Sequence, residues 1–235
     1  VKLLPITGHL FADGSLFVQL QFPNNPYDGI LALFDSGGAL VWHRKGNNHH
    51  WSSVEASSAI LSPSYVTGKS IYGQGRWKVS RRCRLGKRAV VDAIMIVEPD
   101  RSIVNQIDLA EVFIASGYQG LLPLSYTPCD PFHLTSVTSL PPELASSYPG
   151  LSAGDLLVSL LSLNTIAIID RASFKIKWIV SGLTQTQYSP QFIGSNKLLV
   201  IETPGGSAET KIARLVTIDL GTRERVQVFP KASGA

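Results

Sequence analysis

The chain has 235 residues, of which 44% are apolar and 16% are charged, and its formal net charge is +4. Globular proteins have about 25% charged residues on average, and this apolar, weakly charged composition excludes a disordered chain and a coiled coil. The length is that of one large domain or two small ones, which can bury a core without disulfides. Met95 is the only methionine and the chain begins at Val1, so we expect a processed product or part of a longer protein.

Most short apolar runs of the chain are typical of strands. Runs of Val, Ile, Leu and Phe recur between Gly, Asp, Ser and Pro residues. Helical periodicity is confined to a short segment at Asp108–Ala115, and a turn is expected at Pro142–Ser147. The sequence therefore predicts an all-β protein.

A hairpin unit repeats along the chain: an apolar run, an acidic residue, a tight turn and a second apolar strand. The acid is expected to open the turn by accepting hydrogen bonds from backbone N–H groups. Asp35, Asp170 and Asp219 are therefore predicted to be turn residues, whereas Trp42 and Trp178 are expected to pack between strands. The four copies are Ile30–Trp42, Ala93–Val104, Thr165–Trp178 and Arg214–Val226.

A further strand is predicted before each hairpin, so each unit has three or four strands. These strands are Gly14–Leu20, Ala59–Pro63, Gly154–Leu160 and Asn196–Ile201. Strand units repeated in this way indicate a β-propeller with about four blades. A β-sandwich of similar length is the alternative.

Positive charge is concentrated at residues 76–88 (RWKVSRRCRLGKR), which hold seven basic residues and no acid. Such a run predicts a patch for phosphate, nucleic acid or anionic lipid, or a solvated loop facing an acidic partner chain. Only Trp77 lies among the basic residues, whereas single-stranded nucleic acid sites use several stacking aromatics. We therefore do not expect nucleic acid as a partner.

The two cysteines, Cys83 and Cys129, have no CxxC or Cys/His spacing that indicates zinc. They form one disulfide, which would imply an oxidising compartment, or remain two free thiols. The most apolar region, residues 156–169, is interrupted by polar residues and is shorter than the about 18 to 20 residues of a membrane helix. No transmembrane segment is expected.

One stretch of the chain resembles the bacterial arylsulfotransferase family. The segment Asp130-Pro-Phe-His133-Leu-Thr-Ser-Val137 is followed by Gly154-Asp-Leu-Leu-Val-Ser159 and by the hairpin from Ile166 to Trp178. The family pattern is D-x-x-H-x-N-S/D-V, then G-D-L-L-V-S-x-R, then a strand ending in I-D, then W. His49-His50-Trp51 also looks like an earlier part of that pattern. The resemblance implies a six-bladed propeller that transfers sulfuryl groups between phenols, and an extracytoplasmic or periplasmic location.

The resemblance also implies a site made of a nucleophilic histidine, two further histidines and an arginine. His50 and His133 match the two supporting histidines. The arginine position holds Leu161, and the nucleophile position holds Tyr188. Because tyrosine is a neutral phenol at pH 7 and Leu161 carries no charge, sulfuryl transfer is expected to be lost.

The remaining histidines are expected to have no role in chemistry. His49 is predicted to be structural or exposed, and His9 and His43 to lie on the surface. No acidic residue stands at a spacing that would complete a metal site. We therefore predict no metal and no cofactor.

The sequence thus predicts a single propeller domain over residues 1–235 that is incomplete at one or both ends, as an open arc or a ring closed by other residues. We expect a binding or assembly module whose partners are other protein chains, or an aryl sulfate or phenolic ligand in a central channel. An active aryl-sulfate:phenol sulfotransferase with rearranged residues is the alternative. A quinoprotein-like or sugar-lyase propeller is a third hypothesis.

Overall fold

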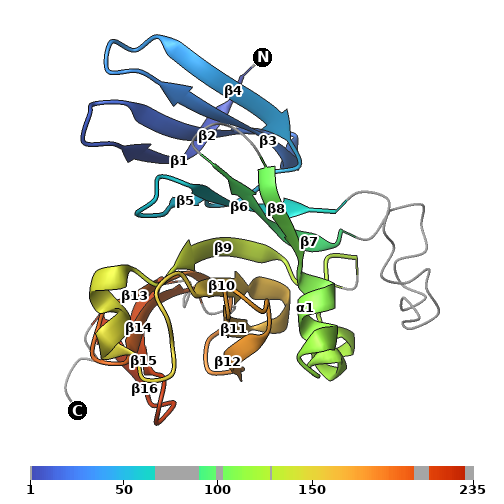
Figure 1. Ribbon diagram of the computed structural model, residues 1–235. Helices are drawn as coiled ribbons and strands as arrows, with labels where there is room; N and C mark the ends of the chain where they lie inside the picture. Colours follow the sequence, from blue (N-terminus) through green and yellow to red (C-terminus); the bar gives the residue numbers. More distant parts are fainter. Residues whose placement is uncertain (1, 67–89, 99–102, 128, 204–211, 231–235) are drawn as a thin grey trace.

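The computed structural model describes residues 2–66, 90–98, 103–127, 129–203 and 212–230. These residues form four antiparallel four-stranded sheets, and each sheet consists of four consecutive strands (Figure 1). The sheets follow one another through the molecule as the blades of a β-propeller, numbered 1 to 4 in chain order below. Four separate sheets exclude the two-sheet sandwich and confirm the predicted four-bladed arrangement.

The strands of each blade have the following bounds. Blade 1 comprises β1 (Leu4–Leu10), β2 (Leu16–Phe22), β3 (Asn25–Phe34) and β4 (Leu40–Gly46). Blade 2 comprises β5 (Ser53–Val54), β6 (Ile60–Tyr65), β7 (Asp92–Val97) and β8 (Ile103–Asp108). Blade 3 comprises β9 (Leu134–Ser139), β10 (Leu156–Leu160), β11 (Thr165–Ile169) and β12 (Ile176–Ser181). Blade 4 comprises β13 (Gln187–Phe192), β14 (Lys197–Glu202), β15 (Arg214–Asp219) and β16 (Arg225–Phe229).

Three of the predicted turn residues act as expected. Asp35 Oδ1 accepts from the backbone N of Ala39 at 2.8 Å. Asp170 Oδ1 accepts from the N of Ser173 at 2.7 Å, and Asp219 Oδ1 accepts from the N of Gly221 at 2.9 Å. These carboxylates close the hairpins locally, which explains why the acid recurs in the sequence unit.

The short helix is also where the sequence predicts it. Helix α1 (Leu109–Ala115) begins after Asp108, whose side chain accepts from the backbone N of Ala110 and Glu111. The 3₁₀ helices are η2 (Gln119–Leu124), η3 (Pro142–Ser147) and η4 (Leu161–Leu163). The turn expected at residues 142–147 is η3.

The hydrophobic core consists of three clusters, each between two successive blades. On β7, Ile94 and Ile96 pack toward blade 3, while Met95 and Val97 pack toward blade 1. Strands β7, β10 and β11 are therefore buried on both faces. Strands of the two end blades, such as β14, alternate between buried and more exposed residues. Burial on both faces explains the continuous apolar runs of the two middle blades.

The predicted role of Trp42 and Trp178 in packing is confirmed. Trp42 is buried in the cluster between blades 1 and 2. Trp178 packs against the cluster between blades 3 and 4, and its Nε1 donates to the carbonyl of Leu220 at 2.9 Å. Both side chains connect neighbouring blades.

The first strands of successive blades meet one another. The backbone N of Trp51 donates to the carbonyl of Thr135 at 3.2 Å, and Ser53 Oγ donates to the carbonyl of Val137 at 2.8 Å. These contacts bring the segment before β5 beside the start of β9. The predicted open arc, or ring completed by other residues, stays a prediction.

Candidate functional site

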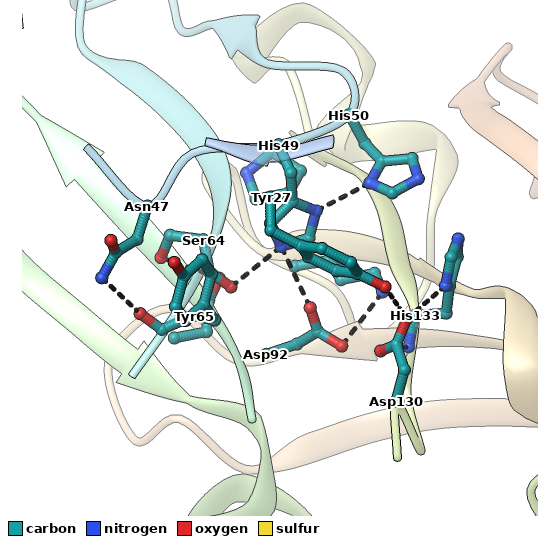
Figure 2. Close-up of polar contacts among 12 residues, drawn as sticks. Tyr27, Asn47, His49, His50, Ser64, Tyr65, Asp92, Asp130 and His133 are labelled. Carbon is teal, nitrogen blue, oxygen red and sulfur yellow. Dashed lines mark hydrogen bonds and ion pairs between the residues drawn. The ribbon is translucent and has the colours of Figure 1, made fainter. Parts of the chain in front are cut away.

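His50 and His133, which we call the histidine pair, occupy matching positions just before the first strands of blades 2 and 3. Their φ angles are 52° and 51°, in the left-handed region that non-glycine residues rarely adopt. The two ring centroids lie 4.8 Å apart, with the ring planes at 73°. The structure therefore brings together the two histidines that the sequence predicts for the site (Figure 2).

A carboxylate holds His133. Its Nδ1 donates to Asp130 Oδ2, and its backbone N donates to Asp130 Oδ1 at 3.1 Å. Tyr27 of blade 1 donates from Oη to Asp130 Oδ2 at 2.6 Å, and burial and this bond raise the pKa of Tyr27. Burial lowers the pKa of His133, but the hydrogen bond and the charge of Asp130 outweigh it and raise that pKa above its ordinary value. The hydrogen bond and the charge of Asp130 thus favour the protonated form of His133.

His50 has the opposite electrostatic environment. Its Nδ1 lies 2.7 Å from Nδ1 of His49. Burial, together with the charges of His49 and His133, lowers the pKa of His50 to about 3. His50 is therefore a neutral imidazole at physiological pH.

His49 and Asp92 form a buried ion pair behind His50. Both side chains are completely buried, and His49 Nε2 lies 3.1 Å from Asp92 Oδ1. The same nitrogen lies 3.2 Å from the carbonyl oxygen of Ser64. Burial raises the pKa of Asp92 and outweighs the hydrogen bond to His49, which lowers it. His49 is thus structural, as one of the two predictions for it states, and it is not exposed.

Two aromatic side chains flank the histidine pair. Trp51 follows His50, with ring centroids 6.5 Å apart, and contacts Tyr188 of β13 edge-on at 5.3 Å. Tyr126 is half-exposed, and burial followed by the charges of Tyr188 and Asp130 raises its pKa. An aromatic ligand that contacts the histidine pair would therefore meet aromatic neighbours.

The position of the family arginine lies beside the histidine pair but carries no charge. Leu161 donates from its backbone N to the carbonyl of His133 at 3.1 Å. Its side chain is buried, with 8% exposed. A charged side chain at this position would lie close to His133, whereas leucine only fills space.

Sequence reasoning missed Asp92 and Tyr27, and it gave Asp130 no role of its own. Asp92 begins an apolar strand that the sequence analysis starts at Ala93, so a lone acid at the start of a buried run was the available signal. Asp130 stands three residues before His133, a spacing that a loop closes easily. Tyr27 lies 103 residues before Asp130, and no local pattern marks it.

A repeated motif also marks the histidine pair. The segments are His50-Trp-Ser-Ser-Val54 and His133-Leu-Thr-Ser-Val137, which share the form H-x-S/T-S-V. The repeat and the matching φ angles indicate the same local backbone before two successive blades. This signal identifies the pair without reference to any family.

The other predicted features have varied outcomes. His9 and His43 are exposed, as predicted. Cys129 is disulfide-bonded, while Cys83 and the basic run at 76–88 lie outside the described residues. Within the described ranges no group of three or more His, Cys, Asp or Glu side chains is placed to hold a metal ion. None of the helices that the structure describes is long and apolar enough to cross a membrane.

Comparisons with known proteins support the fold and leave the family open. The structure is similar to a protein of unknown function from Bacteroides caccae, with a TM-score of 0.52, 11% identity and coverage of 92% of this chain and 64% of that one. A functionally unknown protein from Desulfotomaculum acetoxidans gives a TM-score of 0.51 and 8% identity, with coverage of 95% of this chain and 55% of that one. Quinohemoprotein alcohol dehydrogenase from Comamonas testosteroni gives a TM-score of 0.51 and 9% identity, with coverage of 94% of this chain and 46% of that one.

These similarities at such low identity concern the fold alone. The chain spans between about half and two thirds of the length of the solved structures it matches, from 46% to 64%. No family model matches the sequence, and no curated protein matches it. The resemblance to arylsulfotransferases therefore stays a prediction from the motifs, and so does the quinoprotein-like hypothesis.

Proposed function

We propose that the chain is a β-propeller binding module that holds an aryl sulfate or a phenol at the histidine pair, without transferring a sulfuryl group. The observation that carries this proposal is the 4.8 Å contact between His50 and His133 beside a buried, uncharged Leu161. The raised pKa of His133 favours a protonated ring, which suits an anionic or polar oxygen atom. Trp51 and Tyr188 suit the aromatic ring that carries it.

The absence of sulfuryl transfer follows from two positions. Leu161 offers no charge for the sulfuryl oxygens, and removal of one such electrostatic group costs about 10²–10³ in rate. Tyr188 packs edge-on against Trp51, and an ordinary phenol is a weak nucleophile at neutral pH. An oxidising, extracytoplasmic location fits the disulfide-bonded Cys129.

An active transferase with a rearranged site is the second candidate function. The pKa of His50 is lowered and that of His133 is raised, so the pair offers a neutral proton acceptor beside a proton donor. Two titratable groups whose pKa values are pushed apart are a frequent arrangement in acid–base catalysis. This observation favours catalysis, whereas Leu161 and Tyr188 disfavour it.

One experiment separates the two functions. Calorimetry measures binding of 4-nitrophenyl sulfate and of phenol, and absorbance measures release of 4-nitrophenolate when both are present. We expect binding without turnover, and affinity that falls about tenfold or more in His133→Asn, because a charge-assisted hydrogen bond contributes about 1.5–3 kcal/mol. His43→Asn, at an exposed histidine, is the matched control and should bind as the wild type does.

Two outcomes would overturn the binding proposal. Turnover that disappears in His133→Asn but persists in His43→Asn would establish the transferase instead. Failure of the wild-type chain to bind either compound at millimolar concentration would remove this ligand class for both functions.

A further inference from the structure

The proton on Nε2 of His49 is fixed by its surroundings. This nitrogen lies 3.1 Å from Asp92 Oδ1 and 3.2 Å from the carbonyl oxygen of Ser64. Because both neighbours are hydrogen-bond acceptors, Nε2 carries a hydrogen. The backbone N of His49 also donates to the carbonyl of Pro63 at 3.0 Å, which holds the residue against β6.

The contact between His49 and His50 requires one shared proton. The two Nδ1 atoms are 2.7 Å apart, so one donates and the other accepts. If His49 donates, then the proton of the neutral His50 lies on its Nε2. If His49 accepts, then the proton of His50 lies on its Nδ1, and its Nε2 carries a lone pair and no hydrogen. The protonation of His49 therefore decides what His50 offers to a ligand.

Asp92 favours the first arrangement. Its carboxylate is fully buried, and apart from His49 its contact is the backbone N of Leu134, 3.3 Å from Oδ2. A buried carboxylate is costly unless a cation compensates it. His49 compensates Asp92 when it carries a proton on both nitrogens, which makes its Nδ1 the donor to His50.

We propose that Asp92 and His49 are positioning residues that keep the proton of His50 on Nε2, so that His50 and His133 present two N–H donors to one oxyanion of the ligand. The ligand itself rests on the function proposed above. Asp130 has the matching role for His133, because it accepts from Nδ1 and leaves Nε2 for the ligand. Figure 2 shows the rings of His50 and His133 side by side. Asp130 lies beside His133, and His49 lies between His50 and Asp92.

The groups that face this arrangement come from several elements. Tyr27 of β3 donates to Asp130, and the charge of Asp130 also raises the pKa of Asp92. Burial, followed by the charges of His49 and His133, disfavours a second proton on His50, and these outweigh the charge of Asp130, which favours it. These surroundings thus keep His50 neutral, which is the state that the proposal requires.

The test is the position of the proton in the protein without ligand. Long-range ¹H–¹⁵N spectra of the ¹⁵N-histidine-labelled chain at pH 7 distinguish a protonated ring nitrogen from an unprotonated one. We expect Nε2 of His50 to be protonated in the wild type, and Nδ1 to be protonated instead in Asp92→Asn. Asp13→Asn removes the same charge from an exposed residue bonded to Ser15 in the turn before β2, so it should leave His50 unchanged.

Binding supplies a second readout. In Asp92→Asn we expect the affinity for 4-nitrophenyl sulfate to fall about tenfold or more, because one donor becomes an acceptor. The affinity for phenol, whose hydroxyl group can donate to the new acceptor, should change less. If the role of Asp92 were purely structural, the affinity of Asp92→Asn for both compounds would fall equally.

An unprotonated Nε2 of His50 in the wild type would overturn the inference, as would an unchanged spectrum in a folded Asp92→Asn variant. If Asp92→Asn does not fold, the wild-type spectrum decides alone. Failure of every compound to bind would contradict the proposed function, and the spectrum of the unliganded protein would still test the roles of Asp92 and His49.

Discussion

His50 and His133 share a backbone conformation and differ in almost everything that surrounds their rings. Both precede a first strand, with φ angles of 52° and 51°. His133 contacts a carboxylate three residues earlier and has a raised pKa, whereas His50 contacts another histidine and has a pKa lowered to about 3. The same local motif therefore carries two imidazoles whose pKa values are shifted in opposite directions, because the partners of each ring come from different parts of the chain.

The partners explain the difference in physical terms. Asp130 Oδ2 accepts from His133 Nδ1 and from Tyr27 Oη, and Asp130 Oδ1 accepts from the backbone N of His133. The position corresponding to Asp130 before His50 holds Asn47, which donates instead to the carbonyl of Tyr65 at 3.4 Å. Asp92 is separated from His50 by His49.

Removal of His49 should have the largest effect on the comparison. We expect His49→Ala to lower the free energy of unfolding by about 3–5 kcal/mol, because it leaves the Asp92 carboxylate buried without a cation. His50→Asn keeps a residue that tolerates the left-handed backbone and should cost about 1 kcal/mol. Urea denaturation measures both values. Equal losses in the two variants would show that the pair of His49 and Asp92 contributes no more than the His50 ring.

The stability of the chain at acid pH should depend on His50. The pKa of His50 is about 3 in the folded chain and near its ordinary value of about 6.5 in the unfolded chain, so the unfolded chain binds the extra proton first. Stability should therefore fall as the pH falls from about 6.5 toward 3, by about 1.4 kcal/mol per pH unit from this group. Unfolding free energies measured between pH 7 and 4.5 test this slope.

The matched variant for this loss of stability at acid pH is His50→Asn. Asparagine does not titrate, so the free energy of unfolding should fall less steeply with pH. His133 acts in the other direction. The pKa of His133 is raised in the folded chain. Its contribution to stability is therefore present below about pH 6.5 and is lost as the pH rises through its folded pKa. An acid slope in His50→Asn as steep as in the wild type would assign that slope to other groups.

An exchange of the carboxylate between the two positions should give the smallest and most specific effect. We expect Asp130→Asn to lower the pKa of His133, and Asn47→Asp to raise the pKa of His50, by about 1–3 units each, the range for a neighbouring opposite charge. NMR titration of the two rings measures both values. If Asn47→Asp leaves His50 unchanged, then the similar φ angles do not place the two positions equivalently.

Much of the fold follows from local sequence. The hairpin acids Asp35, Asp170 and Asp219 bond to backbone N–H groups within four residues, so a short pattern contains the whole interaction. Asp108 begins α1 in the same way. The first strands of blades 2 and 3 were harder to identify, because they contact another blade as well as their own, as between Ser53 and Val137.

Local sequence predicted only part of the candidate site. His50 and His133 belong to motifs, and their pairing is the structural outcome. Their states depend on Tyr27, Asp92 and Asp130, which reach the site from blade 1, from blade 2 and from the loop before β9. No spacing in the sequence connects Tyr27 to Asp130, because the contact forms only when blade 1 packs beside the later blades.

The amino-acid sequence by itself determined the strands, the turns and the number of blades, since these depend on apolar periodicity and on hydrogen bonds between near neighbours. It also marked His50 and His133 as members of a repeated motif. Only the tertiary structure decided the direction in which the pKa of each ring is shifted. That decision rests on burial and on carboxylates brought from separate blades, and the packing of blades creates both.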